Sequence, residues 1–166
     1  MTTKPTNMKH LFRAFFLTAA VLTEACTPRE RTLVILSTND MHAKIQRFPQ
    51  LAAAVEECRD TAQLVVLVDA GDRWTGNAFV DKVSVPGKPM IELMNRLGYD
   101  VMTFGNHEFD HGQAFLGRMI DSISAEIVCA NCISDTCTFP QVAPYAVIER
   151  DGIRIGFVGA VTNYEG

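Results

Sequence analysis

The sequence lacks an excess of basic residues. Its 166 residues include 15 lysines and arginines against 19 aspartates and glutamates, which gives a formal net charge of −4 at pH 7. This balance provides no basic footprint for a nucleic-acid polymer, so we exclude that class of partner. An acidic protein can still act on phosphate compounds, because bound divalent cations reverse the local electric field. Small phosphate compounds are therefore not excluded as ligands.

The sequence also has no internal repeat, no low-complexity stretch and no apolar run of the roughly 20 residues that a bilayer crossing needs. Apolar residues make up 48% of the chain and charged residues 20%. These fractions are typical of a folded globular protein and exclude a disordered one. The length fits one domain.

The N-terminal residues have the pattern of an export signal. Basic residues precede a short apolar run at 14–22, and Met8 is an alternative start. A run of this length is typical of a signal-peptide core. We predict a signal peptide over 1–25, and an ordinary hydrophobic helix is the alternative.

Cys26 follows the apolar run and the small residue Ala25. This arrangement resembles a bacterial lipoprotein signal, in which such a cysteine carries the lipid, although Thr23 and Glu24 depart from the usual residues. We predict an exported protein, periplasmic or attached to the outer membrane or cell surface through lipidated Cys26. Plain secretion is the alternative. A short linker over 26–32 and a domain over 33–166 would follow the signal.

Four further cysteines are Cys58, Cys129, Cys132 and Cys137. An even number in an oxidising compartment is compatible with disulfides, and the last two bracket a polar loop that a disulfide could close. A zinc site built from Cys129, Cys132 and Cys137 is less consistent with the sequence, because no second pair of ligands follows at the spacing of a zinc site. Plain burial of the thiols is the other interpretation, so the pairing stays open.

Strand-like and helix-like segments alternate along the chain. We predict strands at 33–37, 64–68, 100–104 and 126–130, helices at 48–59, 88–97 and 111–123, and a hairpin of strands at 145–149 and 153–161. This alternation predicts an α/β layered domain with parallel neighbouring strands. The binding crevice of such sheets lies outside the carboxyl ends of the strands, and the polar clusters of this sequence occur at those ends.

The first two polar clusters follow the first two predicted strands. Asp40 and His42 stand two residues apart, so that on an extended chain both side chains project from one face and can grip one cation. Asp72 follows the second strand between Gly71 and Gly76, which let the backbone bend sharply and approach a ligand. Each pattern is weak alone, since Asp-x-His is usually an exposed loop and Gly-Asp is usually a turn.

The third cluster follows the strand at 100–104. Asn106 offers a neutral oxygen ligand, His107 an imidazole, and Asp110 a carboxylate that can orient a neighbouring imidazole. In the second cluster, Asp69 either assists the residues of the site or is a structural residue of the loop. Trp74 is expected to pack at the base of the loop.

The strings ILSTNDMHA, VDAGDRWTGN and FGNHEFDHG resemble the calcineurin-like metallophosphoesterase superfamily, in its 5′-nucleotidase and 2′,3′-cyclic-nucleotide phosphodiesterase branch. The later string GIRIGFVGAVT is similar to the strand that follows in that branch, so the resemblance covers about 33–162. It implies the layered α/β/β/α metallophosphoesterase fold. It also implies further histidines downstream, including a Gly-His-x-His string. No histidine follows His111, so we expect a fold that is incomplete, missing its C-terminal strands, and the activity of this chain alone stays open.

The resemblance also implies an activity, namely metal-dependent hydrolysis of phosphate esters, nucleotides in the first place, by a metal-bridged hydroxide. Two divalent ions would be bound, and zinc, manganese, magnesium and iron remain open. The implied roles are first-metal ligands for Asp40 and His42, a bridge between the metals for Asp72, a second-metal ligand for Asn106, phosphoryl stabilisation by His107, and orientation of that histidine by Asp110. Asn106 and His107 would also contact the substrate.

Two alternatives remain. His107, Glu108 and His111 satisfy the H-E-x-x-H motif of zinc proteases, which requires a helix so that both histidines share a face. We expect a strand end at this point instead, with His111 starting a helix. The other alternative is a non-catalytic fragment or a surface binding module.

Overall fold

The computed structural model describes residues 30–132 and 139–162. The fold lies in the unit that begins at Thr32. The predicted signal peptide, Cys26 and Cys137 lie outside the described residues, so the lipidation and disulfide predictions stay predictions. Among the described residues, none of the helices has the length and apolar character that a bilayer crossing requires.

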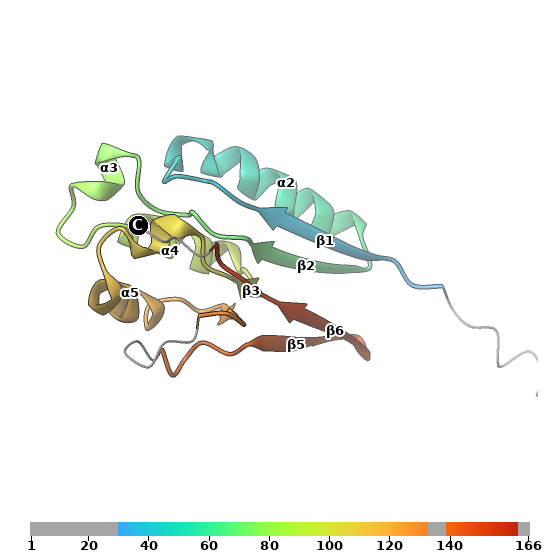
Figure 1. The fold of residues 1–166 in the computed structure, drawn as a ribbon. Coiled ribbons are helices and arrows are strands. Elements are labelled where there is room, and N and C mark those ends of the chain that lie inside the picture. Colours follow the sequence, from blue (N-terminus) through green and yellow to red (C-terminus); the bar gives the residue numbers. More distant parts are fainter. Residues whose placement is uncertain (1–29, 133–138, 163–166) are drawn as a thin grey trace, which may run out of the picture. The chain divides into compact units, whose positions relative to one another are not determined.

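A parallel four-stranded sheet forms the centre of this unit, in the order β1-β2-β3-β4. Its strands are β1 (Leu33–Thr38), β2 (Leu64–Asp69), β3 (Val101–Met102) and β4 (Glu126–Ile127). Thr38 pairs with Asp69, and Asp69 pairs with Met102, so three neighbouring strands end side by side. The loops that follow these strands therefore meet at one edge of the sheet (Figure 1).

Three helices cover one face of the sheet. They are α2 (Phe48–Thr61), α4 (Lys88–Leu97) and α5 (Gln113–Ile120). Their apolar residues form two buried clusters with Leu67, Met102 and Ile127 of the sheet. The four-residue helix α3 (Ala78–Asp81) precedes α4, and short 3₁₀ helices occur at η2 (Ile45–Arg47) and η3 (Asn106–Phe109).

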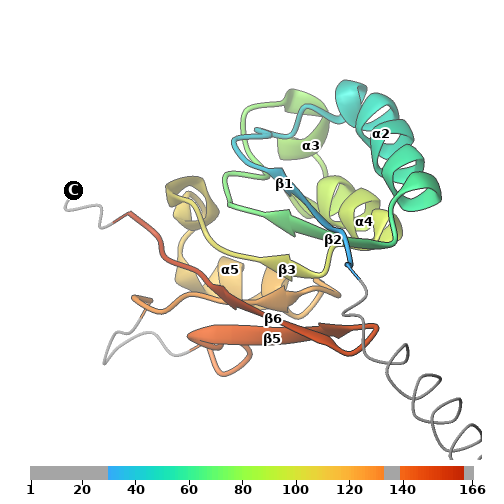
Figure 2. The ribbon, with the colours of Figure 1, turned by 90° about the vertical axis from the view of Figure 1, so that its right-hand side faces the viewer.

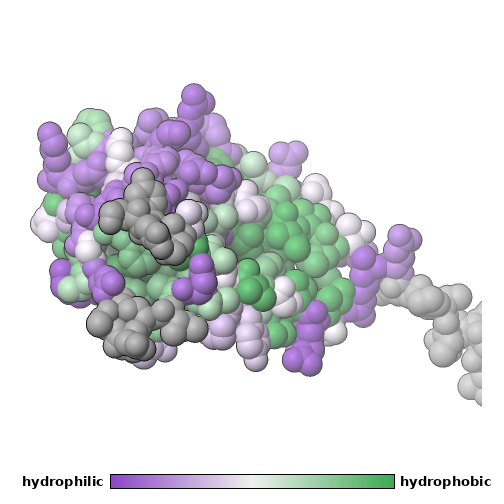
Figure 3. All heavy atoms as spheres, in the orientation of Figure 1, coloured by the Kyte–Doolittle hydropathy of each residue, from purple (hydrophilic) through white to green (hydrophobic). Residues whose placement is uncertain are grey.

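An antiparallel hairpin of β5 (Tyr145–Arg150) and β6 (Ile153–Val158) lies on the side of the sheet opposite α2 and α4 (Figure 2). Its residues Phe157 and Val158 line a 150 Å³ cavity together with Val68 and Val101 of the sheet. Figure 3 shows apolar residues gathered over β1, β2 and β6. The layered α/β fold with a parallel sheet is thus confirmed.

The predicted boundaries differ most at the short strands. Only two residues each of β3 and β4 have ladder partners, where five residues were predicted. Helix α5 begins at Gln113, not at residue 111, because Gly112 at φ 79° and ψ 165° breaks the helical backbone. Helix α4 has the predicted bounds, with Gly98 ending it in the left-handed conformation at φ 74°.

Candidate metal centre

The loop after β1 has an unusual backbone. Asp40, His42 and Ala43 have φ values of 50°, 44° and 53°, in the left-handed region that residues with a Cβ seldom adopt. Asp72, in the loop after β2, has φ 54°. Such conformations cost free energy and are found mainly at functional sites, where surrounding contacts enforce them.

Backbone hydrogen bonds join the loop after β1 to the loop after β2. The amide of Asp40 donates to the carbonyl of Gly71 at 3.1 Å, and the amide of His42 donates to the carbonyl of Asp72 at 2.9 Å. A third bond runs from the amide of Ala43 to the next carbonyl of the second loop at 2.9 Å. These bonds fix where His42 lies relative to Asp72.

Two glycines bring the loop after β2 against the loop after β3. A Cβ on Gly71 would collide with the backbone of Phe104 and Gly105, and a Cβ on Gly105 would collide with the carboxylate of Asp72. Gly71 also has φ 104°, which only glycine adopts readily. Gly71 and Gly105 therefore allow the two loops to approach each other more closely than residues with a Cβ could.

Together the loops place His42, Asp72 and His107 in one cluster. Their ligand atoms all lie within 4.8 Å of one another, and the two imidazole rings meet edge to face with centroids 4.8 Å apart. Asp72 Oδ1 accepts a hydrogen bond from the backbone amide of His107 at 2.8 Å. Two imidazoles and a carboxylate are a donor set that fits a divalent transition metal such as zinc, manganese or iron.

Asp40 and Asn106, the other two predicted ligands, border this cluster. Asp40 Oδ1 lies 3.8 Å from Nε2 of His42, and its side chain is 61% exposed. Its other oxygen accepts a hydrogen bond from Asn39 at 2.5 Å. Asn106 is half-buried and directly precedes His107 at the start of η3. The structure thus brings the predicted ligands to one region, and their roles stay predictions.

Asp110 lies beside the imidazole of His107, in the geometry expected of an orienting partner. Its Oδ2 is 2.9 Å from Nδ1 of His107. This hydrogen bond raises the pKa of His107 above its usual 6.5, and the charges of Asp110, Asp72 and Glu108 act in the same direction. The pair favours a proton on Nδ1 of His107, and this leaves Nε2 for a ligand.

Glu108 is a buried residue whose role the sequence did not indicate. Its side chain is completely buried, and its carboxylate accepts hydrogen bonds from the backbone amides of Asp72, Arg73 and Gly105 at 2.9, 3.0 and 2.5 Å. One side chain therefore holds the loop after β2 to the loop after β3. Two of these partners are backbone groups some 35 residues away, and no sequence pattern marks such a contact.

Arg73 and Asp69 complete this buried network. Arg73 Nε donates to Asp69 Oδ2 at 2.9 Å and lies 3.9 Å from Glu108, and all three side chains are fully buried. Burial alone lowers the pKa of Arg73, but the charges of Glu108 and Asp69 raise it above its ordinary value. Asp69 also accepts a hydrogen bond from Thr38 of β1 at 2.8 Å. Asp69 is therefore structural, and Trp74 is fully buried as expected.

The zinc-protease alternative does not fit this geometry. His107 and Glu108 belong to a 3₁₀ helix that ends at Phe109, and His111 lies in the turn after it, exposed and in contact with the ring of Phe115. A 3₁₀ helix repeats every three residues, so positions four apart do not share a face. The carboxylate of Glu108 is buried against backbone amides and cannot serve as a general base.

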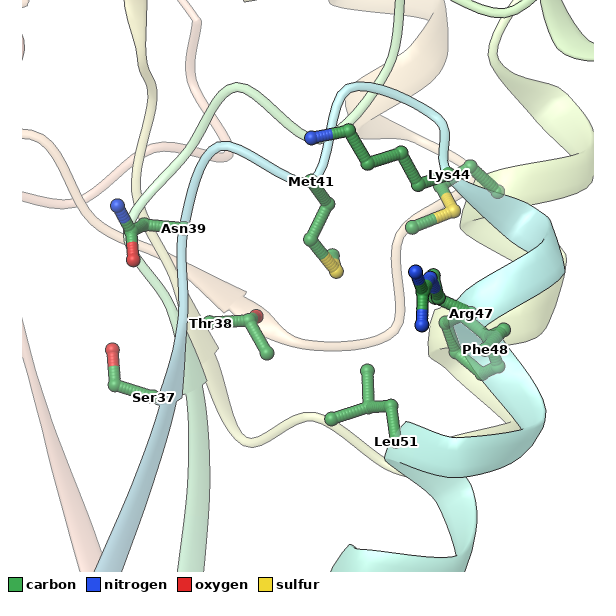
Figure 4. Close-up of a pocket in the computed structure, with 9 residues that line it drawn as sticks. Ser37, Thr38, Asn39, Met41, Lys44, Arg47, Phe48 and Leu51 are labelled. Carbon is green, nitrogen blue, oxygen red and sulfur yellow. The ribbon is translucent and has the colours of Figure 1, made fainter.

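Two cavities adjoin the loop after β1. A cleft of 790 Å³ is lined by His42, Lys44, Ile45, Gln46 and residues 76–79. A second cavity of 310 Å³ lies between the end of β1 and the start of α2 (Figure 4). Met41 and Leu51 point into it, with the cationic groups of Lys44 and Arg47 nearby. Of these two cavities, the first includes a member of the metal-ligand cluster and the second does not.

Known proteins with similar sequences are much longer than this chain. Endonuclease YhcR of Bacillus subtilis (strain 168) is 30% identical over 187 residues, which cover 90% of this chain and 15% of that protein. Snake venom 5′-nucleotidase of Gloydius brevicauda is 29% identical over 151 residues, covering 78% of this chain and 25% of that protein. The chain thus spans a quarter or less of these two relatives.

A solved structure agrees with the sequence comparison. The 5′-nucleotidase precursor from Thermus thermophilus superposes with a TM-score of 0.69 at 28% identity, over 78% of this chain and 28% of that one. The family model described as calcineurin-like phosphoesterase matches residues 33–138, a range that includes all three loops of the metal-ligand cluster. This chain therefore belongs to the calcineurin-like phosphoesterase family.

Proposed function

We propose that the protein takes part in metal-dependent hydrolysis of phosphate esters, with nucleotides as the substrate class. The observation that carries this proposal is the convergence of His42, Asp72 and His107 within 4.8 Å at the carboxyl ends of parallel strands. Membership of the calcineurin-like phosphoesterase family supports it, as do relatives named 5′-nucleotidases. The net charge of −4 favours a small substrate over a nucleic-acid polymer.

In this proposal His42 and Asp72 hold the cations together with their neighbours Asp40 and Asn106. A pair of divalent cations held there would neutralise charge on the phosphoryl oxygens and lower the pKa of a bound water. The imidazole of His107 faces the charge that develops on the phosphoryl group, and Asp110 keeps that ring oriented through its hydrogen bond to Nδ1. Asn106 adds an oxygen donor without adding negative charge.

Export is part of the same proposal. A signal peptide over 1–25 would place the domain outside the cytoplasm, and lipidation at Cys26 would attach it to a membrane surface. A relative from snake venom supports an extracellular location. Mass spectrometry of the mature N-terminus in a bacterial host tests this part, since an unprocessed chain that begins with Met1 contradicts it.

The full chain, freed of metal and then loaded with Mn²⁺ or Zn²⁺, is the material for the main test. Bound metal is counted by elemental analysis, and phosphate release is followed with AMP and with p-nitrophenyl phosphate. We expect bound metal in the wild-type chain, and phosphate release only where metal is bound. A chain that binds no metal contradicts the proposal. A His107→Ala variant separates the steps, because it should lose release of phosphate before it loses all bound metal.

A further inference from the structure

The 310 Å³ cavity between the end of β1 and the start of α2 is separate from the metal-ligand cluster, since neither His42, Asp72 nor His107 lines it. Sites for small organic molecules have volumes of about 300–1,000 Å³. An apolar cavity of about 150 Å³ accepts one benzene molecule. This cavity therefore has room for one compact organic group together with a polar head group.

Apolar side chains form one wall of this cavity. Phe48 and Met90 are buried members of a core cluster, and Met41 and Leu51 pack against that cluster. Figure 4 shows Met41 and Leu51 pointing into the cavity. Because the removal of apolar surface from water is favourable, an apolar group of a ligand gains free energy when it lies against this wall.

Two cationic side chains, Lys44 and Arg47, also line the cavity, whereas no carboxylate does. Both are exposed, and in the part of the chain that the structure describes neither side chain has an ion pair or a hydrogen bond. An anionic group can therefore pair with them without displacing an existing partner. The planar guanidinium of Arg47 matches the two oxygens of a carboxylate. The cavity thus fits a ligand that is anionic at one end and apolar at the other.

The cavity and the metal-ligand cluster share the loop after β1. Asn39 lines the cavity and donates a hydrogen bond to the carboxylate of Asp40 at 2.5 Å. Met41 lies in the chain between Asp40 and His42. Lys44 lines both this cavity and the cleft that includes His42. An anion that pairs with Lys44 reduces the positive potential near His42, so it favours a cation there.

We propose that this cavity is an effector site for a small organic carboxylate with a compact apolar tail, and that its occupation raises the metal affinity of the neighbouring cluster. The ligand is about the size of phenylacetate and is not a substrate. Its binding goes beyond the proposed function, because the cavity requires no metal. Only the effect on metal affinity rests on the proposed metal centre.

Binding to the metal-free full chain tests the cavity. The probes are phenylacetate, its neutral analogue phenylacetamide, and acetate, which has the charge without the tail. We expect phenylacetamide to bind about 3- to 10-fold more weakly than phenylacetate, since exposed ion pairs contribute modestly. Acetate should bind at least about 10-fold more weakly, because it lacks the apolar group. NMR of methionine methyl groups locates the ligand: the signals of Met41 and Met90 should shift, and that of Met119, in the other core cluster, should not.

Arg47→Gln removes one charge of the cavity and keeps a side chain of similar shape. It should weaken phenylacetate binding about 3- to 10-fold and leave phenylacetamide binding unchanged. Arg154→Gln is the matched control, because Arg154 is exposed on β6 and does not line the cavity. It should bind all three probes as the wild type does.

The effect on the metal is measured by titrating Mn²⁺ into the full chain with and without saturating phenylacetate. We expect the Mn²⁺ affinity to rise about fivefold, at the lower end of the usual coupling between two sites. Phenylacetate should gain the same factor from saturating Mn²⁺, since such coupling is reciprocal. Acetate at the same concentration controls for direct contact between carboxylate and metal, and Arg47→Gln should reduce the gain.

The two proposals fail in distinguishable ways. Absence of saturable phenylacetate binding, equal binding to Arg47→Gln and wild type, or methyl shifts away from Met41 and Met90 overturns the cavity assignment, and the proposed function stands. Binding that leaves the Mn²⁺ affinity unchanged overturns the effector role. A chain that binds phenylacetate in the cavity but binds no metal overturns the proposed function together with the effector role, and the cavity assignment stands.

Discussion

The carboxylate of Glu108 accepts a hydrogen bond from the backbone amide of Asp72 at 2.9 Å, although 36 residues separate them in the sequence. Asp72 in turn accepts a hydrogen bond from the amide of His107 at 2.8 Å. Each of two adjacent loops therefore binds the other through a carboxylate. The position of the metal-ligand cluster depends on Glu108, a residue that is fully buried and holds the loops through their backbone amides.

Glu108→Gln should weaken both the fold and metal binding. The amide nitrogen of glutamine cannot accept the backbone N–H bonds, and the buried Arg73 loses part of its counter-charge. We expect a loss of about 2–4 kcal/mol in the free energy of unfolding, measured in urea, and a metal affinity about 10- to 100-fold lower. Glu92→Gln is the control, because Glu92 is exposed and pairs only loosely with Lys88 at 3.8 Å. An unchanged metal affinity in Glu108→Gln would contradict the positioning role.

Asp72→Asn should lower the number of bound metal ions. Asparagine tolerates the left-handed backbone at this position and can still accept the amide of His107, so the fold should persist while the negative charge is lost. We expect elemental analysis to show loss of both ions if Asp72 bridges them. Asp60→Asn, an exposed change on α2, is the control. Two ions retained at full occupancy would rule out the bridging role.

Asp110→Asn should lower the pKa of His107 in the metal-free protein, because it removes the main cause of the raised value. A raised pKa in the folded state means that the pair stabilises the fold below the ordinary histidine pKa of about 6.5, and that this contribution is lost as the pH rises through the folded-state value. NMR titration of the His107 ring measures the shift. Asp121→Asn, on the exposed end of α5, should leave that titration unchanged.

Gly71→Ala should prevent the two loops from closing. The new methyl group would meet the backbone of Gly105 in a conformation, φ 104°, that alanine disfavours. We expect a loss of more than about 3 kcal/mol in the free energy of unfolding. Gly156→Ala on β6 is the control, since a Cβ there meets nothing within 4 Å. Similar urea midpoints for the two variants would show that the close approach of the loops is not required.

The sequence predicted the elements whose signals are local. Helix α4 has a proline near its start and Gly98 after its end, and both bounds were correct. The ends of β3 and the start of α5 were wrong, because ladder partners and the φ of Gly112 depend on the rest of the chain. Helix α3 was missed, since four residues are too few to show a periodicity.

The candidate site was predictable where a residue type suggests its own chemistry. Carboxylates and imidazoles after apolar strands indicated Asp72 and His107 before any contact was known. Arg73 and Glu108 were missed as supports because their partners come from other segments of the chain and include backbone amides. Burial and long-range pairing decide such roles, and a single sequence contains neither.

The contact between Gly71 and Gly105 has a consequence for redesign. Because Gly71 and Gly105 meet through backbone atoms, this contact does not involve the side chain at position 42. Exchanging the imidazole for a carboxylate at position 42 should alter the preference between softer and harder cations while the backbone stays the same. The metal ligand at this position can therefore be exchanged on the same backbone.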